Sequence, residues 1–285
     1  MKINMLCINS ETGKINILEI ENQNDLEMEN QSDLEMENQS DMDNNLIYDT
    51  IIGSVPQGEN IADTIAGDAW SLVETAKGKV GIAMTTSGST RPPMLSESLI
   101  GMDIQEAARA LMSWNFEEAS LALAAINACL NTEARMKEFH CKEPYDNYCT
   151  RGLDLSGKRL GLIGHLKMPE EVRNAAAECH ILELHPQPGD YPASACEWIL
   201  PECEIVIITG SSLINKTLPR LLALCRNAYT ILAGPTVPLC PALLDLGIDR
   251  LAGLVINDPE RMKKRQAAGV SGAPYDCGQS FLIMR

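Results

Sequence analysis

The chain has no long apolar run and no recognisable export segment. Its 285 residues are 45% hydrophobic and 22% charged, as in soluble globular proteins. No stretch approaches the roughly 18 consecutive apolar residues that a membrane-spanning helix requires. At the start of the chain, Asn4, Asn9 and Ser10 interrupt the apolar core that a secretory signal would need. We therefore expect a cytoplasmic protein without a membrane partner.

Cysteine pairs with metal-site spacing are also missing. The sequence has ten cysteines but no Cys-x-x-Cys, and the nearest pairs, Cys196 with Cys203 and Cys141 with Cys149, are too widely spaced for a zinc knuckle. In a cytoplasmic chain such cysteines are mostly buried thiols. We expect core thiols rather than nucleophiles at the four positions with apolar neighbours: Cys129, Cys203, Cys225 and Cys240.

Basic residues are scarce. The chain has 23 Lys and Arg against 39 Asp and Glu, which gives a formal net charge of −16. A nucleic-acid partner is not expected, because binding to phosphates requires clustered Lys and Arg. The run 261–265 is the exception, and we expect it on the outer face of a helix.

Nine of the acids lie in residues 21–44, which contain no Lys or Arg. This segment is a tandem octad, ENQNDLEM, ENQSDLEM and ENQSDMDN. An eight-residue period forms no straight apolar seam on a helix, so the segment is interpreted as a solvated linker whose deletion leaves the fold intact. The alternative is an acidic arm that recruits a protein partner.

The order of apolar runs predicts an α/β protein. Residues 1–20 read as an accessory β-hairpin, and residues 45–140 as a small α+β domain with three strands followed by two helices, the second capped by Asn115. In residues 155–285, short runs of β-branched and aliphatic residues alternate with helical segments and end in an edge strand. Such runs are typical of parallel strands, and they predict a Rossmann-like three-layer domain. Ligands bind outside the carboxyl ends of such strands.

Two nucleotide-binding patterns are incomplete. Gly161 and Gly164 lack the spacing of the dinucleotide fingerprint, and in the segment 210–217 Asn215 replaces the second glycine of a phosphate-binding loop. We therefore expect neither NAD nor ATP. An anion could still be held by the start of the following helix together with Lys216 and Thr217.

Polar side chains follow the ends of neighbouring strands. His165 follows one strand, Glu183 and His185 end the next, and Asp190 lies in the turn after it. Imidazole and carboxylate suit a borderline divalent metal, and they equally suit a general acid–base pair. The structural alternative is a hydrogen-bonded turn in which Asp190 caps a helix beginning at Pro192.

Other polar residues are candidates for ligand binding. Arg91 lies in an extended loop, where its guanidinium suits either a carboxylate or phosphate ligand or a surface ion pair. Asn115 and Glu118 fit helix-cap chemistry, with Glu118 at the capping-box position. Asn127, inside an alanine-rich helix, needs buried partners. Further candidates at the ends of later strands are Thr209, Ser211 and Thr236.

Several long segments resemble the family described as "Putative heavy-metal chelation" domains. They are residues 91–101, 113–128, 161–166, 182–192, 199–222 and 232–253. The resemblance covers residues 45–285 and implies an enolase-N-like first domain packed on a Rossmann-like second, with a cleft between them. The positions that it places at the cleft are Arg91, Asn115, Glu118, His165, Glu183, Asp190, Thr209, Lys216 and Thr236.

We expect a protein that binds a divalent or heavy-metal ion, or a small metal-chelating molecule, in this cleft, with His165, Glu183 and Asp190 as metal ligands. One alternative is an enzyme that acts on a small anionic metabolite at the same cleft. Another is a non-catalytic interaction module that uses the acidic octads. The identity of the metal and the presence of a homo-oligomer stay open.

Overall fold

The computed structural model describes residues 3–8, 15–20, 45–87, 91–95, 98–139 and 149–285. The chain divides into two compact units, Met1–Leu46 and Ile47–Arg285. In the first unit, strands β1 (Ile3–Ile8) and β2 (Ile15–Ile20) pair antiparallel, which confirms the predicted hairpin. The octad segment lies outside the described residues.

A helix over 45–53 leads into the second unit, where a small antiparallel sheet follows it. Its strands are β3 (Ile61–Ala66), β4 (Trp70–Thr75) and β5 (Val80–Met84). Gly78 makes the tight turn between the last two strands at a φ of 73°, a conformation that glycine adopts without strain. The predicted three-stranded sheet is thus confirmed.

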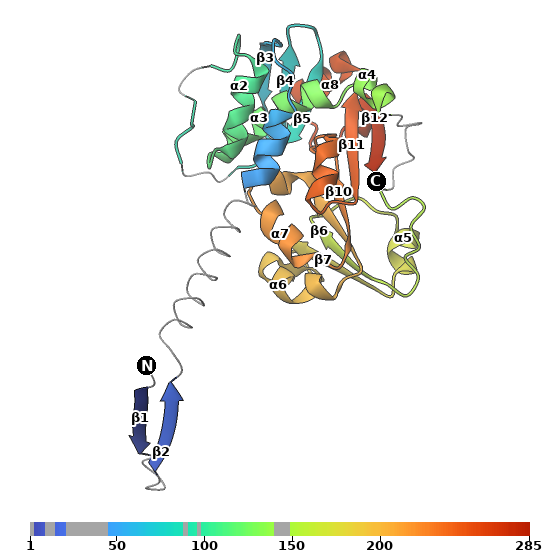
Figure 1. The fold of residues 1–285 in the computed structure, drawn as a ribbon. Coiled ribbons are helices and arrows are strands. Elements are labelled where there is room, and N and C mark those ends of the chain that lie inside the picture. Colours follow the sequence, from blue (N-terminus) through green and yellow to red (C-terminus); the bar gives the residue numbers. More distant parts are fainter. Residues whose placement is uncertain (1–2, 9–14, 21–44, 88–90, 96–97, 140–148) are drawn as a thin grey trace. The chain divides into compact units, whose positions relative to one another are not determined.

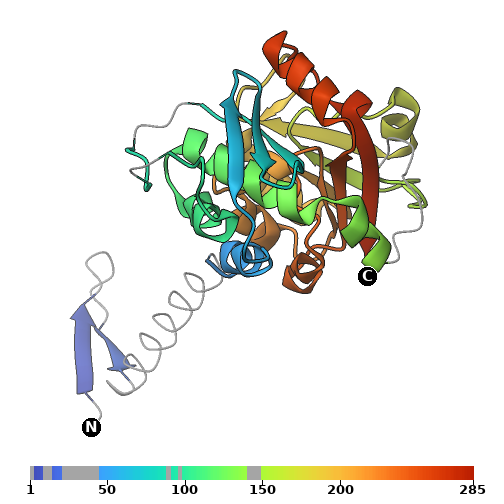
Figure 2. The same ribbon diagram turned by 90° about the horizontal axis from the view of Figure 1, so that it is seen from above.

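Helix α3 (Phe116–Leu130) lies along this sheet (Figures 1 and 2). The two are so close that a Cβ on Gly81 of β5 would lie 2.1 Å from the carbonyl oxygen of Ala124. The helix is buried along its length because its small alanine side chains allow this approach. Its N-cap is Asn115, as predicted, and the shorter α2 (Ile104–Ala108) is capped by Asp103.

The large sheet has seven strands, and all but one are parallel. The order across it is β12-β11-β10-β9-β6-β7-β8, with β12 antiparallel to β11. This is the doubly wound order. From β6 the chain builds the sheet outward in one direction through β7 and β8, and then from β9 in the other, while these strands stay parallel. The fold prediction, a mixed α/β protein with a mainly parallel sheet and a smaller α+β part, is confirmed. The strands are β6 (Arg159–Ile163), β7 (Glu178–Glu183), β8 (Tyr191–Pro192), β9 (Ile205–Thr209), β10 (Tyr229–Ala233), β11 (Arg250–Ile256) and β12 (Gly278–Met284).

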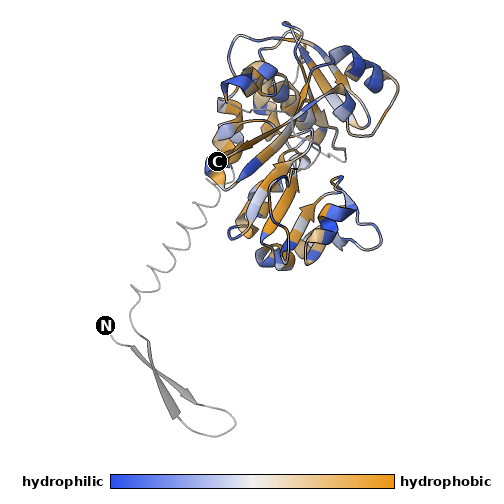
Figure 3. Ribbon diagram, turned by 90° about the vertical axis from the view of Figure 1, so that its right-hand side faces the viewer, coloured by the Kyte–Doolittle hydropathy of each residue, from blue (hydrophilic) through white to orange (hydrophobic). Residues whose placement is uncertain are grey.

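The strands of the large sheet are strongly hydrophobic (Figure 3), and the inner ones are buried on both faces. The helices that connect these strands are short, so the chain returns to the sheet after only a few helical turns. They are α5 (Glu170–Ala175), α6 (Cys196–Ile199), α7 (Leu218–Leu224) and α8 (Pro259–Ala267), with α4 (Glu133–Glu138) preceding the sheet. No helix in the described part of the chain could span a membrane.

Two buried asparagines of α3 join the small sheet to the large one. Asn127 donates to the carbonyl oxygens of Ile82 (2.8 Å) and Thr236 (3.0 Å), so the nitrogen of the predicted buried amide has two partners, whereas its buried Oδ1 accepts no hydrogen bond from the described residues. At the helix end, Asn131 donates to Val237 (2.9 Å) and Leu254 (3.1 Å) and accepts from the backbone of Leu239 (2.7 Å). Because these bonds are buried, they fix how the two sheets pack.

The basic run 261–265 lies on α8, where Arg261, Lys263 and Arg265 form ion pairs within the chain. Arg261 and Arg265 both pair with Asp276, and Lys263 contacts Glu74 of β4 at 2.9 Å. These pairs attach the helix to its neighbours, whereas the sequence had predicted a solvated stripe.

Candidate functional site

A cluster of three side chains lies at the carboxyl ends of β6 and β7. After β6 the chain turns at Gly164, with a φ of 94°, and presents His165. The adjacent β7 ends at Glu183, and Asp190 lies in the loop to β8. Since β6 and β7 are neighbours in register, the three predicted metal ligands do come together.

Hydrogen bonds orient the cluster. His165 Nε2 lies 2.7 Å from Asp190 Oδ2, which also accepts from the backbone N–H of Gln187 at 2.7 Å. Because of the Gln187 N–H and the nearby His165, the pKa of the Asp190 carboxyl lies below its usual value. The structural alternative is confirmed in part: Gln187 and Asp190 form a hydrogen-bonded turn and His185 is exposed, but Asp190 caps no helix, since the short turn after Pro192 has no side-chain cap.

The other side of the imidazole faces Glu183. Nδ1 lies 3.9 Å from Glu183 Oε1, which is too long for a hydrogen bond. An ionised Asp190 only accepts, so Nε2 donates to it, and Nδ1 is the ring nitrogen that has no hydrogen-bond partner at this distance. Nδ1 and the Glu183 carboxylate face each other across the gap, an arrangement that a proton or a cation would complete.

Among the described residues, no group of three or more His, Cys, Asp or Glu side chains is placed to hold a metal ion by itself. The reason at this cluster is the hydrogen bonding of Asp190, which turns its oxygen toward Nε2 and Gln187. Metal ligation by His165, Glu183 and Asp190 stays a prediction.

A cavity of about 530 Å³ opens beside Glu183. Its wall comes from the end of β5, the carboxyl ends of β6, β7 and β9, and helix α7. It therefore lies at the point where the strand order reverses, the usual place for ligands in such sheets. Of the residues predicted from sequence, those in the wall are Glu183, His185, Thr209, Ser211, Lys216 and Thr217.

The Lys216 amine is engaged within the protein. It donates to the carbonyl oxygens of Leu111 (2.6 Å) and Ile214 (3.0 Å), and it lies 5.4 Å from the centre of the Tyr48 ring. Burial lowers the pKa of this amine to about 8. Lys216 also has a φ of 65°, a backbone conformation that side chains rarely adopt. Its contacts favour a structural tie over the expected contact with an anion.

Thr217 occupies the N-cap position of α7, but its hydroxyl does not cap the helix. It donates instead to Asn215 Oδ1 at 2.7 Å. Asn215, the residue that breaks the phosphate-loop pattern, thus organises the turn with its side chain. At the end of β9, the hydroxyls of Thr209 and Ser211 lie 2.8 Å apart in the cavity wall.

Four further predicted residues lie outside the cavity wall. Glu118 accepts from the backbone N–H groups of Met94 and Leu95, at 2.7 Å each, so it completes no capping box with Asn115. Asn115 donates to the Arg91 carbonyl oxygen (3.0 Å), and both side chains hold the loop that carries the exposed Arg91. Buried Thr236 accepts from the Met84 N–H (2.9 Å).

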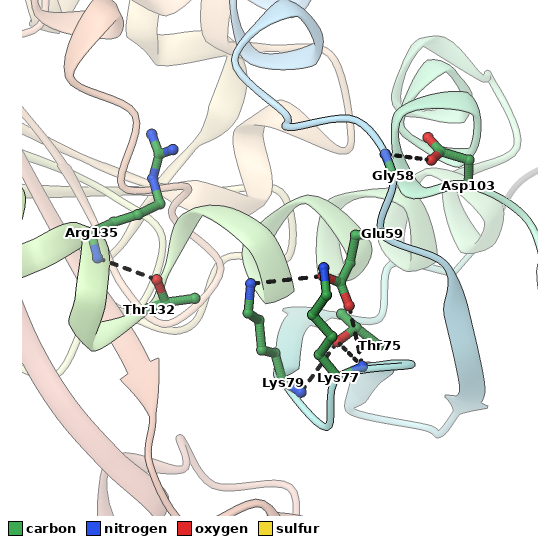
Figure 4. Close-up of polar contacts among 8 residues, drawn as sticks. All are labelled: Gly58, Glu59, Thr75, Lys77, Lys79, Asp103, Thr132 and Arg135. Atoms are coloured by element: carbon green, nitrogen blue, oxygen red, sulfur yellow. Dashed lines mark hydrogen bonds and ion pairs between the residues drawn. The ribbon is translucent and has the colours of Figure 1, made fainter.

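A second carboxylate cluster was not predicted. Glu59, only 4% exposed, accepts from the amine of Lys77 (2.6 Å) and from its backbone N–H (3.2 Å), and the Lys79 amine lies 3.9 Å away. Figure 4 shows both lysines of the β4–β5 turn directed at this carboxylate. Nothing in the sequence around Glu59 distinguishes it from a surface acid.

The described cysteines are all free thiols, and Cys129, Cys203, Cys225 and Cys240 are buried as expected. Burial raises the pKa of Cys129 and Cys203 to about 11 and that of Cys225 to about 12. Cys196, which sequence reasoning missed, lines the cavity, and burial raises its pKa to about 11 as well. These thiols are poor nucleophiles and poor metal ligands at neutral pH.

Comparison with known proteins agrees with this fold. A solved structure of a protein with unknown function from Desulfitobacterium hafniense DCB-2 is 34% identical, has a TM-score of 0.74, and matches over 85% of this chain and 98% of its own. Another, from Pyrococcus horikoshii, is 22% identical with a TM-score of 0.68, over 84% of this chain and 100% of its own, and it shows the fold alone.

Among curated proteins, an uncharacterized protein from Methanocaldococcus jannaschii is 28% identical over 204 residues, which are 68% of this chain and 76% of that protein. Residues 48–130 and residues 152–281 match two family models, and both are described as "Putative heavy-metal chelation". Both solved structures come from the family that matches the second of these ranges. The chain therefore belongs to the family described as "Putative heavy-metal chelation".

Proposed function

We propose that this protein binds a divalent metal ion at the carboxyl ends of β6 and β7, with His165 Nδ1 and Glu183 Oε1 as its ligands. The observation that carries the proposal is that His165 Nδ1 and Glu183 Oε1 face each other across 3.9 Å without a hydrogen bond. An imidazole nitrogen and a carboxylate oxygen suit borderline divalent metals such as zinc. The family description points to the same chemistry.

Asp190 has a different role in this proposal. A histidine that binds a metal usually donates its other ring N–H to a carboxylate, which fixes the tautomer and the ring orientation. Asp190 stands in that position, 2.7 Å from Nε2, and is itself held by the N–H of Gln187. It orients His165 without touching the metal, whereas the sequence had suggested that it was a third ligand.

The test is calorimetric titration of the chelator-treated protein with zinc. We expect His165→Ala and Glu183→Ala to abolish the binding that wild type shows. The matched control is His180→Ala, because His180 also contacts a carboxylate, Glu178 at 3.1 Å, on the same strand but away from the cavity wall. Unchanged zinc binding in both cluster variants would exclude the site.

A second candidate function is acid–base catalysis on a small anionic metabolite. It is favoured by the Asp190–His165 hydrogen bond, because a histidine oriented by a carboxylate is also the arrangement of a general base. A thermal-shift screen of carboxylate and phosphate metabolites on metal-free protein tests it.

A further inference from the structure

The proposed metal site supplies too few donors. Zinc takes four ligands, and other divalent metals take up to six or more. Only His165 Nδ1 and Glu183 Oε1 converge at the gap, and in the described ranges no larger set of His, Cys, Asp and Glu side chains does so. At least two coordination positions must therefore be filled by something other than these side chains.

The size and lining of the adjacent cavity suit an organic ligand better than water molecules alone as the source of these donors. Its volume of about 530 Å³ falls in the range of sites for organic ligands, roughly 300–1,000 Å³. Much of its wall is apolar and contributed by residues from both sheets and from α7: Met84, Ile163, Leu182, Leu184, Leu221 and Leu224. Water lying against these apolar side chains would lack the two to four polar partners that an ordered molecule needs, so this part of the wall suits an apolar ligand body.

The charges of the wall restrict the occupant further. Its Lys and Arg side chains are already paired. The Lys216 amine donates to two carbonyl oxygens, and Arg220 forms an ion pair with Glu197, with its Nε 2.9 Å from Oε1. Hydroxyl groups, including those of Thr209 and Ser211, supply neutral hydrogen-bonding positions. A strongly anionic ligand such as a phosphorylated metabolite would find no unpaired lysine or arginine in this wall.

We propose that the cavity binds a neutral or weakly acidic organic chelator with a largely apolar body, and that the metal is held as the complex of this molecule. Glu183 links the two parts, because it lies in the cavity wall and faces His165. The chelator supplies the missing donors, and the cavity recognises its apolar body. This inference rests on the proposed metal site, but it adds the class of the organic ligand.

The test uses zinc alone and zinc with one equivalent of 8-hydroxyquinoline, a planar apolar bidentate chelator. Binding is followed by calorimetry and by the fluorescence of the zinc complex. We expect the complex to bind at least 10-fold more tightly than zinc alone. Zinc binding at equal or higher affinity without the chelator would overturn the inference while leaving the metal site intact.

Variants of α7 locate the chelator. Leu224→Trp, which fills the cavity, should weaken the complex at least 10-fold and leave binding of zinc alone unchanged. Leu222→Trp is the matched control, since Leu222 is half-buried on the same helix but outside the cavity wall. Ser87→Trp, at an exposed position of the wall, gives a second test that does not disturb the core.

Equal binding of the complex by wild type, Leu224→Trp and Ser87→Trp would contradict the cavity assignment. Failure of the metal site itself is recognised separately, because Glu183→Ala would then alter neither zinc nor complex binding. If Glu183→Ala weakens zinc while both tryptophan variants bind the complex normally, the metal site stands and the chelator proposal falls.

Discussion

Two carboxylates in this chain lie close to strand ends and differ in what surrounds them. Glu59 is buried, and it accepts from the amine and the backbone N–H of Lys77, with Lys79 nearby. Glu183 accepts one backbone N–H, from His185 at 3.3 Å, and its other oxygen faces an imidazole nitrogen at 3.9 Å. Glu59 is thus surrounded by donors, as a structural carboxylate is, whereas Glu183 keeps an oxygen without a hydrogen bond to the imidazole, as the proposed metal ligand would.

The largest expected effect is on binding. Glu183→Ala should lower zinc affinity on the order of 100-fold or more, since losing even an outer-sphere partner of a metal ligand typically costs 10–100-fold. Its effect on the free energy of unfolding should stay below about 1 kcal/mol, because few contacts are lost at a cavity wall. Calorimetry and urea unfolding measure the two quantities. A large loss of stability with unchanged zinc affinity would make Glu183 structural.

Glu59→Ala should show the opposite pattern. It removes an acceptor from the Lys77 side chain and backbone, so we expect a loss of about 2 kcal/mol in unfolding free energy and no change in zinc affinity. Glu202→Ala is the control, because its pair with Arg159 is exposed and worth about 0–1 kcal/mol. Equal unfolding curves for the two variants would show that the buried contacts of Glu59 add nothing to the free energy of unfolding.

Asp190→Asn should have a smaller effect than loss of a ligand. The amide oxygen can still accept the Gln187 N–H, but the charge that favours Nε2–H on His165 is removed. We expect zinc affinity to fall about 10–100-fold. Asp154→Asn, a similar change at an exposed carboxylate that accepts the Ser156 N–H, should have no effect. Complete loss of binding in Asp190→Asn would instead indicate that Asp190 is a direct ligand.

The smallest effect is a pH dependence at Glu59. Burial alone would raise the pKa of this carboxyl, but the hydrogen bonds from Lys77 and Thr75 outweigh it and leave the pKa below the usual 4.5. A lowered pKa in the folded state adds stability above the unfolded value, and this stability is lost as the pH falls through the folded value. The stability difference between wild type and Glu59→Gln should therefore be constant from pH 6 to 8 and shrink below about pH 4.5. A stability difference that stays constant as the pH falls below about 4.5 would show that ionisation of Glu59 is not coupled to folding.

The sequence predicted much of the framework, because periodicity and caps are local. Alternating and apolar runs located the strands of both sheets except the short β8, which was predicted as a turn, and Asn115 marked the start of α3. The meeting of His165, Glu183 and Asp190 was also predictable, since neighbouring parallel strands end at the same edge of a sheet.

The partners of individual polar groups could not be predicted, because they come from distant parts of the chain. Lys216 reaches the Leu111 carbonyl oxygen, and Thr236 accepts from Met84. Glu59 is buried because the β4–β5 hairpin folds over it (Figure 4), and the sequence around Glu59 does not indicate this contact. Sequence reasoning therefore placed these side chains at one edge of the sheet but could not say which of their polar groups were already hydrogen-bonded.

The most direct test of the account is an anomalous-diffraction map, recorded at the zinc edge, of crystals grown with zinc and 8-hydroxyquinoline. We predict a peak within bonding distance of both His165 Nδ1 and Glu183 Oε1, with density for the chelator extending into the cavity toward Leu224 and with Asp190 still hydrogen-bonded to Nε2. A peak coordinated by the buried thiols, by Glu59 or by Asp190 in place of Glu183 would contradict the account.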